Sequence, residues 1–200
     1  MDFSKILDQL APIAQHFDVS MLDYLEVIAA HTTVRQLRTG DQFPIVGYED
    51  HQAAYIVEGV FRVYSVDATG KETIIRLPAE GDFTMYIENY KTFNPDINYH
   101  WEAITDATIL TWGKDDLEFL VQNIPSWYFL TLKILQTITL RLTIERGEMF
   151  NDDATTRYIK FSERYPHIIA RVPLRQVANY LGIAPQSLSR IRQNLTKSSN

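Results

Sequence analysis

The chain has 200 residues, no cysteine and a formal net charge of −6. Without cysteine it can form neither disulfides nor thiolate-ligated zinc or iron–sulfur sites, and it has no cysteine nucleophile. The N-terminus lacks the apolar core of a signal peptide, and charged or polar residues interrupt the most apolar stretch, 127–144, so no membrane span is expected. These features predict a globular cytoplasmic protein without a membrane partner.

The first 113 residues divide into a helical segment and a strand-rich segment. Apolar residues recur at helical spacing up to about residue 30. From 31 to 113, short runs of β-branched and aromatic residues alternate with Gly-containing breaks, which is typical of an antiparallel sandwich or barrel. Gly59 and Gly70 stand where hairpin turns need a positive φ, and 53–64 is predicted to form two strands joined at Glu58-Gly59.

Residues 114–150 return to a helical pattern. Pro125 marks a break, and the long helix after it is predicted to end at a hinge formed by Gly147 and Asn151-Asp152-Asp153. Two interpretations of this helix stay open: it packs on its own domain only, or it has a second apolar face for a partner copy. The second interpretation assigns to dimerisation the residues in a 3–4 alternation: Tyr128, Leu132, Leu135, Thr139 and Leu142.

The charge is distributed unevenly along the chain. Residues 154–200 contain eight Lys or Arg and one Glu, a net charge of +7, whereas residues 1–153 carry −13. An acidic body with a basic C-terminal module is typical of a DNA-binding unit attached to a different function. Within the basic module, 154–165 is predicted to be a helix that Pro166 stops.

Residues 172–195, VPLRQVANYLGIAPQSLSRIRQNL, match a helix-turn-helix that begins at Leu174. Ala178 is the small residue at which the two helices approach, and Gly182 falls at the turn position that needs a positive φ. Leu188 and Ile191 are predicted to anchor the second helix, whose N-cap, Ala184, is a poor one. The alternative is a plain helical hairpin.

In a helix-turn-helix the start of the second helix enters the major groove of DNA. The residues predicted to contact bases are Pro185, Gln186, Ser187, Ser189 and Arg190. The cations better placed for phosphates, which give affinity without sequence information, are Arg175, Arg192 and Lys197.

The whole layout resembles the Crp/Fnr family of bacterial transcription regulators, most specifically in PLRQVANYLGIAPQSLSRIR at 173–192 and VEGVFRVYSVDATGKETIIRLPAEGDF at 57–83. The resemblance implies an α+β fold: an N-terminal double-stranded β-helix (a β-roll of the cyclic-nucleotide-binding type), a long dimerisation helix and a C-terminal all-α helix-turn-helix domain. The expected domains are 1–113, the helices and sensory roll; 114–150, the dimerisation helix and hinge; and 151–200, the DNA-binding domain.

The resemblance also implies partners. It predicts a homodimer that binds a two-fold symmetric operator in double-stranded DNA, with RNA polymerase as a further partner. By position, Pro185, Gln186 and Arg190 match the family's base-contacting places. The histidines show no ligand spacing, so neither a metal nor another cofactor is expected, and no catalytic residues are predicted. The protein is therefore predicted not to be an enzyme.

Two departures from the family pattern matter. Where cyclic-AMP-binding members have a Glu for the ribose and an Arg for the phosphate, this chain has Met85-Tyr86 and Asn98-Tyr99. Since a phosphate diester needs a charge-assisted partner to leave water, no control by cyclic AMP is predicted. The aromatic residues nearby either form roll core or line a pocket for an unidentified small-molecule effector, with Met85, Tyr86, Asn98 and Tyr99 as its candidates.

The second departure is the wing. The sequence stops at Asn200, so the β-hairpin wing that usually follows the recognition helix is expected to be truncated or absent. This departure and the missing cyclic-nucleotide clamp leave a different class of function open: an effector-binding or protein-interaction module that keeps the fold without productive DNA binding.

Overall fold

The computed structural model describes residues 8, 12–13, 15, 22–43, 53–85 and 99–198. Most of the N-terminal helical segment therefore lies outside the described residues, but its end is helical as predicted, in η1 (Leu22–Tyr24) and α2 (Leu25–Ala30). Within the described residues, no helix is both long enough and apolar enough to cross a membrane.

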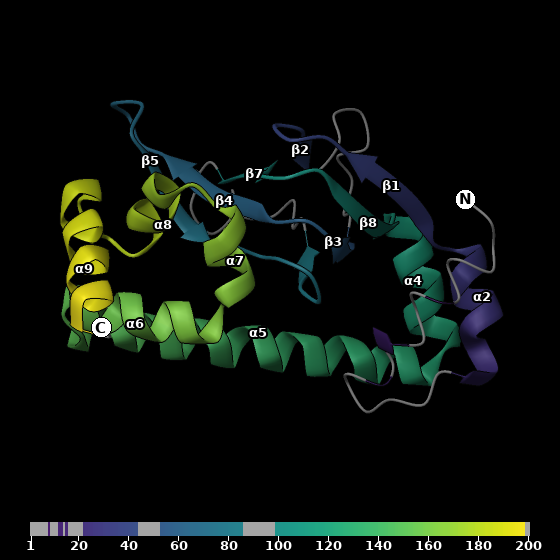
Figure 1. Cartoon of the computed structure of the whole chain (residues 1–200). Coiled ribbons are helices and arrows are strands. Elements are labelled where there is room, and N and C mark those ends of the chain that lie inside the picture. Colours follow the sequence, from purple (N-terminus) through teal and green to yellow (C-terminus); the bar gives the residue numbers. More distant parts are fainter. Residues whose placement is uncertain are drawn as a thin grey trace.

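Strands of the described chain form two facing antiparallel sheets. Their order is β1-β8-β3-β6 in one sheet and β2-β7-β4-β5 in the other. This arrangement confirms the predicted β-roll, which Figure 1 shows above the long helix. The strands are β1 (Thr33–Leu37), β2 (Gln42–Phe43), β3 (Ala53–Glu58), β4 (Phe61–Val66), β5 (Glu72–Arg76), β6 (Phe83–Met85), β7 (Tyr99–Ala103) and β8 (Ala107–Trp112).

The roll closes because small and branched side chains fill the space between its sheets. Ile56 of β3, Phe61 of β4 and Ile109 of β8 are at most 2% exposed and belong to one buried cluster with Trp101 of β7. Burial of such side chains contributes about 1.5–3 kcal/mol each. Strand β8 is buried on both faces for most of its length, because Ile109 packs in this cluster while Leu110 and Trp112 pack in a second cluster with α4 and α5.

The two predicted turn glycines have different roles. Both have a positive φ, +113° at Gly59 and +82° at Gly70. Gly70 lies in the turn between the paired strands β4 and β5, so it is a hairpin glycine as predicted. The prediction for Gly59 was right about φ and wrong about the hairpin, because β3 and β4 pair with other strands and belong to opposite sheets. Gly59 forms the corner at which the chain passes from one sheet to the other.

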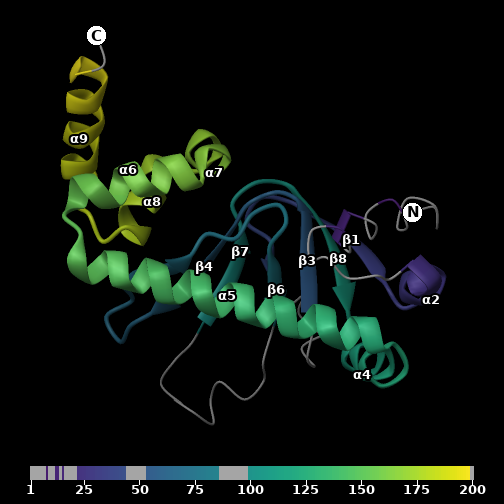
Figure 2. The same ribbon diagram turned by 90° about the horizontal axis from the view of Figure 1, so that it is seen from below.

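Two helices follow the roll: α4 (Lys114–Asn123) and the long α5 (Pro125–Asn151). The predicted break is confirmed, since Pro125 occupies the first turn of α5, where a missing N–H costs nothing. The side of α5 that faces the roll buries Trp127, Leu130 and Ile134 in one core with α2 and α4. Figure 2 shows α5 in the foreground, crossing the roll from α4 to the C-terminal helices.

The C-terminal module is all helical, with α6 (Ala154–Arg164), α7 (Pro166–Arg171), α8 (Leu174–Tyr180) and α9 (Pro185–Ser198). The predicted stop at Pro166 is present, but the same proline begins α7, a short helix that the pattern did not indicate. No strand follows α9 in the part of the chain that the structure describes.

The core of this module continues into the roll. Phe161, Val177 and Leu188 of the C-terminal helices share one buried cluster with Tyr64 and Ile74 of β4 and β5. The helix-turn-helix thus packs directly on the roll in this arrangement. The division into domains at 113 and 150 stays a prediction.

Candidate DNA-binding site

The helix-turn-helix has the geometry that its sequence predicted. Ala178 of α8 is fully buried, and its carbonyl accepts a hydrogen bond of 2.9 Å from the main-chain N–H of Ile183 after the turn. Gly182 has the expected positive φ of +63°. A Cβ at Gly182 would also lie 3.2 Å from the Met149 side chain, so this turn is close to the end of α5.

Helix α9 is held by one face and leaves the other in solvent. Leu188 is fully buried, and its N–H donates to the carbonyl of Ala184 at 3.0 Å, the bond expected when Ala184 is the N-cap. Ile191 and Leu195 pack at the edge of the same core. The anchoring predicted for Leu188 and Ile191 is therefore present.

The residues predicted to contact DNA all lie on the solvent side. Each of them is exposed: Pro185, Gln186, Ser187, Ser189, Arg190, Arg192 and Lys197 on α9, and Arg175 on α8. Helix α9 contains no acidic residue, and it stands at the end of the molecule opposite α2 and α4 in both views (Figures 1 and 2). The arrangement presents a basic helix face with no carboxylate of its own helix to compete for a phosphate or a base edge. The individual DNA-contacting roles stay predictions.

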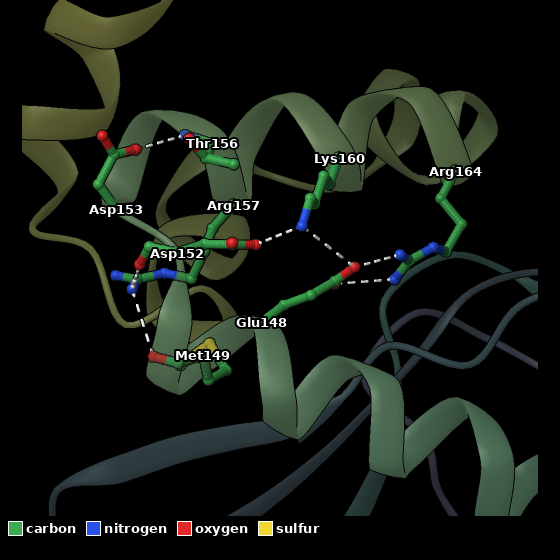
Figure 3. A network of polar contacts seen from close by, with 8 residues as sticks. All are labelled: Glu148, Met149, Asp152, Asp153, Thr156, Arg157, Lys160 and Arg164. Carbon is green, nitrogen blue, oxygen red and sulfur yellow. Dashed lines mark hydrogen bonds and ion pairs between the residues drawn. The ribbon is translucent and has the colours of Figure 1, made fainter.

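A network of charged side chains fixes α6 against the end of α5 (Figure 3). Arg164 donates to both carboxylate oxygens of Glu148, at 3.1 and 2.5 Å, and Lys160 lies 2.7 Å from the carboxylate of Asp152. Asp153 caps α6 by accepting from the N–H of Thr156 at 2.7 Å. The segment Asn151-Asp152-Asp153, predicted as a hinge, is thus an ordered corner between two helices. The prediction that Gly147 helps to end the helix was wrong, because α5 continues through it to Asn151.

Arg157 links this corner to the helix-turn-helix. Its guanidinium donates to the main-chain carbonyl of Asp152 at 2.8 Å and to that of Leu181, in the turn before α9, at 3.1 Å. Because both acceptors are main-chain atoms, Arg157 links the turn after α8 to the end of α5. This role was not predicted from the sequence, although Arg157, Lys160 and Arg164 recur at helical spacing, and the last two face Asp152 and Glu148 at the end of α5 (Figure 3).

Helix α8 is also bound to the edge of the roll. The Asn179 side chain accepts from the N–H of Ile74 at 2.7 Å and donates to the carbonyl of Glu72 at 2.9 Å. Both bonds are made to main-chain groups of β5. The amide therefore satisfies two polar groups of this strand, and it ties the first helix of the motif to the roll.

The predicted dimerisation residues lie on the uncovered side of α5. Tyr128 is 49% exposed and Leu135 44%, with Leu132 and Leu142 at 39% and 40%, and Thr139 is exposed as well. The opposite side of the helix is buried against the roll. Large apolar side chains left in water on this scale are typical of an interaction surface. The pattern fits the predicted second apolar face, whose occupant stays a prediction.

The predicted effector pocket is only partly within the described residues. Tyr86 and Asn98 lie outside them, as does the side chain of Met85 in β6. Tyr99 begins β7 and is half-buried. Among the residues that the structure describes, no group of three acidic or histidine side chains is placed to hold a metal ion.

The described chain thus combines a β-roll, a long helix and a C-terminal helix-turn-helix. No protein-family model matches the sequence. A transcriptional regulator, flp, of Lacticaseibacillus casei is 22% identical over 151 residues, which cover 71% of this chain and 67% of that protein.

Solved structures place the fold more closely. The similar structures include a CooA mutant from Carboxydothermus hydrogenoformans, with a TM-score of 0.63, 18% identity and coverage of 90% of this chain and 86% of that one. FixK2 from Bradyrhizobium japonicum has a TM-score of 0.61 and 17% identity over 84% of this chain and 86% of its own. A Crp/Fnr-family regulator from Eubacterium rectale has a TM-score of 0.62 and 12% identity, covering 90% and 85%. This chain has the fold of the Crp/Fnr transcription regulators, which confirms the resemblance stated from its sequence.

Proposed function

We propose that the protein is a transcription regulator that binds a two-fold symmetric DNA operator as a homodimer. The observation that carries the proposal is the solvent face of α9. It presents Gln186 and Arg190 near the start of a helix that the buried Leu188 anchors in the core. Arg pairs bidentately with guanine and Gln with adenine, each contact giving about 1–3 kcal/mol of discrimination. Two of the relatives named above are described as transcriptional regulators, and the action that we propose here is binding without catalysis.

The uncovered face of α5 supports the proposed dimer. Its uncovered apolar stripe repeats every three or four residues from Tyr128 to Leu142, the spacing that pairs two parallel helices. Pairing along this stripe would give the two copies of α9 a two-fold relationship, with half-sites about one helical turn, roughly 34 Å, apart.

We infer that RNA polymerase is the further partner. We also infer that cyclic AMP is not the signal, which isothermal titration with cyclic AMP would contradict by showing micromolar binding.

Selection from a random DNA pool tests the proposal. The purified full chain is run beside the double variant Gln186→Ala, Arg190→Ala and beside a matched control on α4, Lys114→Ala, Gln122→Ala. The control removes the same two kinds of exposed side chain at the opposite end of the molecule. We expect the parent and the control to enrich one two-fold symmetric motif and the α9 variant to lose it. Equal enrichment by all three proteins, or none at low salt, would overturn the proposal in favour of a protein-interaction module.

A further inference from the structure

Glu145 lies on the side of α5 that faces the roll and the C-terminal helices, away from the apolar stripe that we assign to a partner copy. Its side chain is only 16% exposed. One turn earlier on the same side, Arg141 pairs with Asp82 of the roll, in the loop before β6. The burial of Glu145 therefore comes from its own chain and does not depend on a second copy that covers α5.

Two tyrosine hydroxyls of the C-terminal helices reach the Glu145 carboxylate. Tyr165, between α6 and α7, donates to it at 2.7 Å. Tyr180 is the last residue of α8, and burial, the charge of Glu145 and a hydrogen bond to that carboxylate raise the pKa of its hydroxyl. Both tyrosine rings lie 5.3 Å from the ring of Phe161. One carboxylate of α5 thus contacts the start of α7 and the end of α8.

The surroundings of this contact supply the carboxylate with little else. The cavity that α5 forms there with the roll and the two tyrosines has a volume of about 20 Å³, room for roughly one water. Arg164 lies 4.0 Å from Glu145, but its guanidinium donates two hydrogen bonds to Glu148. Because a buried carboxylate is costly without donors, an arrangement that moved the tyrosines away would be disfavoured.

The place of Glu145 along α5 gives this contact control over the direction of α9. The chain leaves α5 at Asn151, about 9 Å further along the helix axis. An attachment at that corner alone would let the C-terminal helices pivot, whereas a second attachment away from the corner fixes their angle. Tyr180 ends α8 just before the turn that leads to α9 at Pro185, so this second attachment acts close to the recognition helix.

We propose that Glu145 is a positioning residue that fixes the angle between α5 and the recognition helix α9 through Tyr165 and Tyr180. The consequence for DNA rests on the proposed function. Because α5 is the proposed dimer contact, this angle sets the separation of the two copies of α9, and therefore the half-site spacing that the dimer accepts. One base pair more or less changes the separation of the half-sites by about 3.4 Å and their relative rotation by about 35°.

Distances between two spin labels on one chain test the positioning role without DNA. The chain has no cysteine, so Lys114→Cys on α4 and Gln193→Cys on α9 place the labels at two exposed positions. Dilution with unlabelled parent restricts electron–electron double resonance to distances within one chain. The variants are Glu145→Gln and the double variant Tyr165→Phe, Tyr180→Phe. The matched control, Tyr158→Phe, removes another tyrosine hydroxyl from the same core.

We expect one narrow distance distribution for the parent and for Tyr158→Phe. The distribution should be wider or shifted for Glu145→Gln and for the double variant, at matching circular dichroism. Equal distributions in all four proteins overturn the proposal.

A second arm measures the preference for half-site spacing, which a loss of stability alone would not move because it weakens binding to every spacing alike. Fluorescence anisotropy compares the selected operator with operators one base pair shorter and longer. The preference for the selected spacing should fall about threefold or more in the double variant and stay unchanged in Tyr158→Phe. An unchanged preference with weaker binding to all three operators overturns the positioning role. If the parent itself selects no operator, the proposed function fails, while the label distances still decide whether Glu145 positions α9.

Discussion

Arg171 of α7 forms a two-pronged ion pair with Glu80 of the roll, at 2.6 and 2.5 Å. The same carboxylate accepts a hydrogen bond of 2.7 Å from the main-chain N–H of Gly59, at the corner between the two sheets. A single acid is therefore shared by the roll and the C-terminal helices. With the two Asn179 bonds to β5, it joins the helix-turn-helix to the roll by polar contacts outside their common core.

This sharing predicts a dependence of stability on pH. Partial burial raises the pKa of Glu80, but the hydrogen bonds from Arg171 and from the Gly59 N–H outweigh burial and lower the pKa from 4.5 to about 2. Because the folded pKa is the lower one, the contribution of Glu80 is fully present above about pH 4.5 and is lost as the pH falls toward 2. Since both side chains are about one-third exposed, we expect about 1 kcal/mol after screening.

Urea unfolding between pH 2.5 and 7 measures this contribution. Glu80→Gln should lower the free energy of unfolding at pH 7 by about 1 kcal/mol and should differ less from the parent as the pH falls. Glu118→Gln, which removes an exposed acid of α4, is the control and should follow the parent. A constant gap between Glu80→Gln and the parent over the whole range would mean that Glu80 does not titrate in this way.

The corner glycine gives a prediction that separates backbone strain from collision. A Cβ at Gly59 would lie 2.5 Å from the Cβ of Ala107, at a φ of +113°, whereas a Cβ at Gly70 meets nothing within 4 Å. We expect Gly70→Ala to cost about 1 kcal/mol of unfolding free energy, from its positive φ alone. Gly59→Ala should cost about 3 kcal/mol or more, since strand β8 must also move. Thermal unfolding measures the loss of stability in the two variants. Equal losses would mean that the contact with Ala107 adds no cost at Gly59.

Gly59 also shows what could not be predicted from the sequence, namely which strands pair with each other. A positive φ is required both in a hairpin and at a corner between two sheets. The pattern of residues 53–64 therefore predicted two strands but could not show which strands they pair with. Which strands pair depends on residues far along the chain, since Ala53 of β3 pairs with Trp112 of β8 and Phe61 of β4 pairs with Ala103 of β7. The helix-turn-helix could be predicted fully because its constraints are local: Ala178, Gly182 and Leu188 act within one short segment.

The corner between α5 and α6 shows a second limit. Asn151-Asp152-Asp153 is typical of a break, and the helix does end there, but its polar residues serve as caps and ion-pair partners. Helix α7 was missed because six residues are too few to show a period, and Pro166 ends one helix while beginning the next.

Pairing through α5 predicts the effect of a charge on its uncovered stripe. Leu135→Lys would place an ammonium group in the apolar seam without a counterion, which costs about 3 kcal/mol or more in the dimer. Thr137→Lys adds the same charge at an exposed position two residues further along, on another side of the helix. Sedimentation velocity across a concentration series should show weaker dimers for Leu135→Lys and parent-like dimers for Thr137→Lys. If both variants behave alike, the stripe is not the dimer contact.

Arg190 and Arg175 are expected to affect DNA binding in different ways. Arg190 lies on the solvent face of α9, whereas Arg175 lies in the first turn of α8, the first helix of the motif, which crosses the DNA backbone in a helix-turn-helix. Arg190→Ala should lower affinity for the selected operator by about 1–3 kcal/mol and reduce its preference over unrelated DNA. Arg175→Ala should weaken binding to every sequence alike and reduce the slope of log affinity against log salt by about 1, because one phosphate contact is lost. Fluorescence anisotropy with operator and scrambled duplexes, each over a salt series, measures both quantities. If Arg175→Ala changes the preference while Arg190→Ala changes only the salt slope, then α8 and not α9 reads the bases.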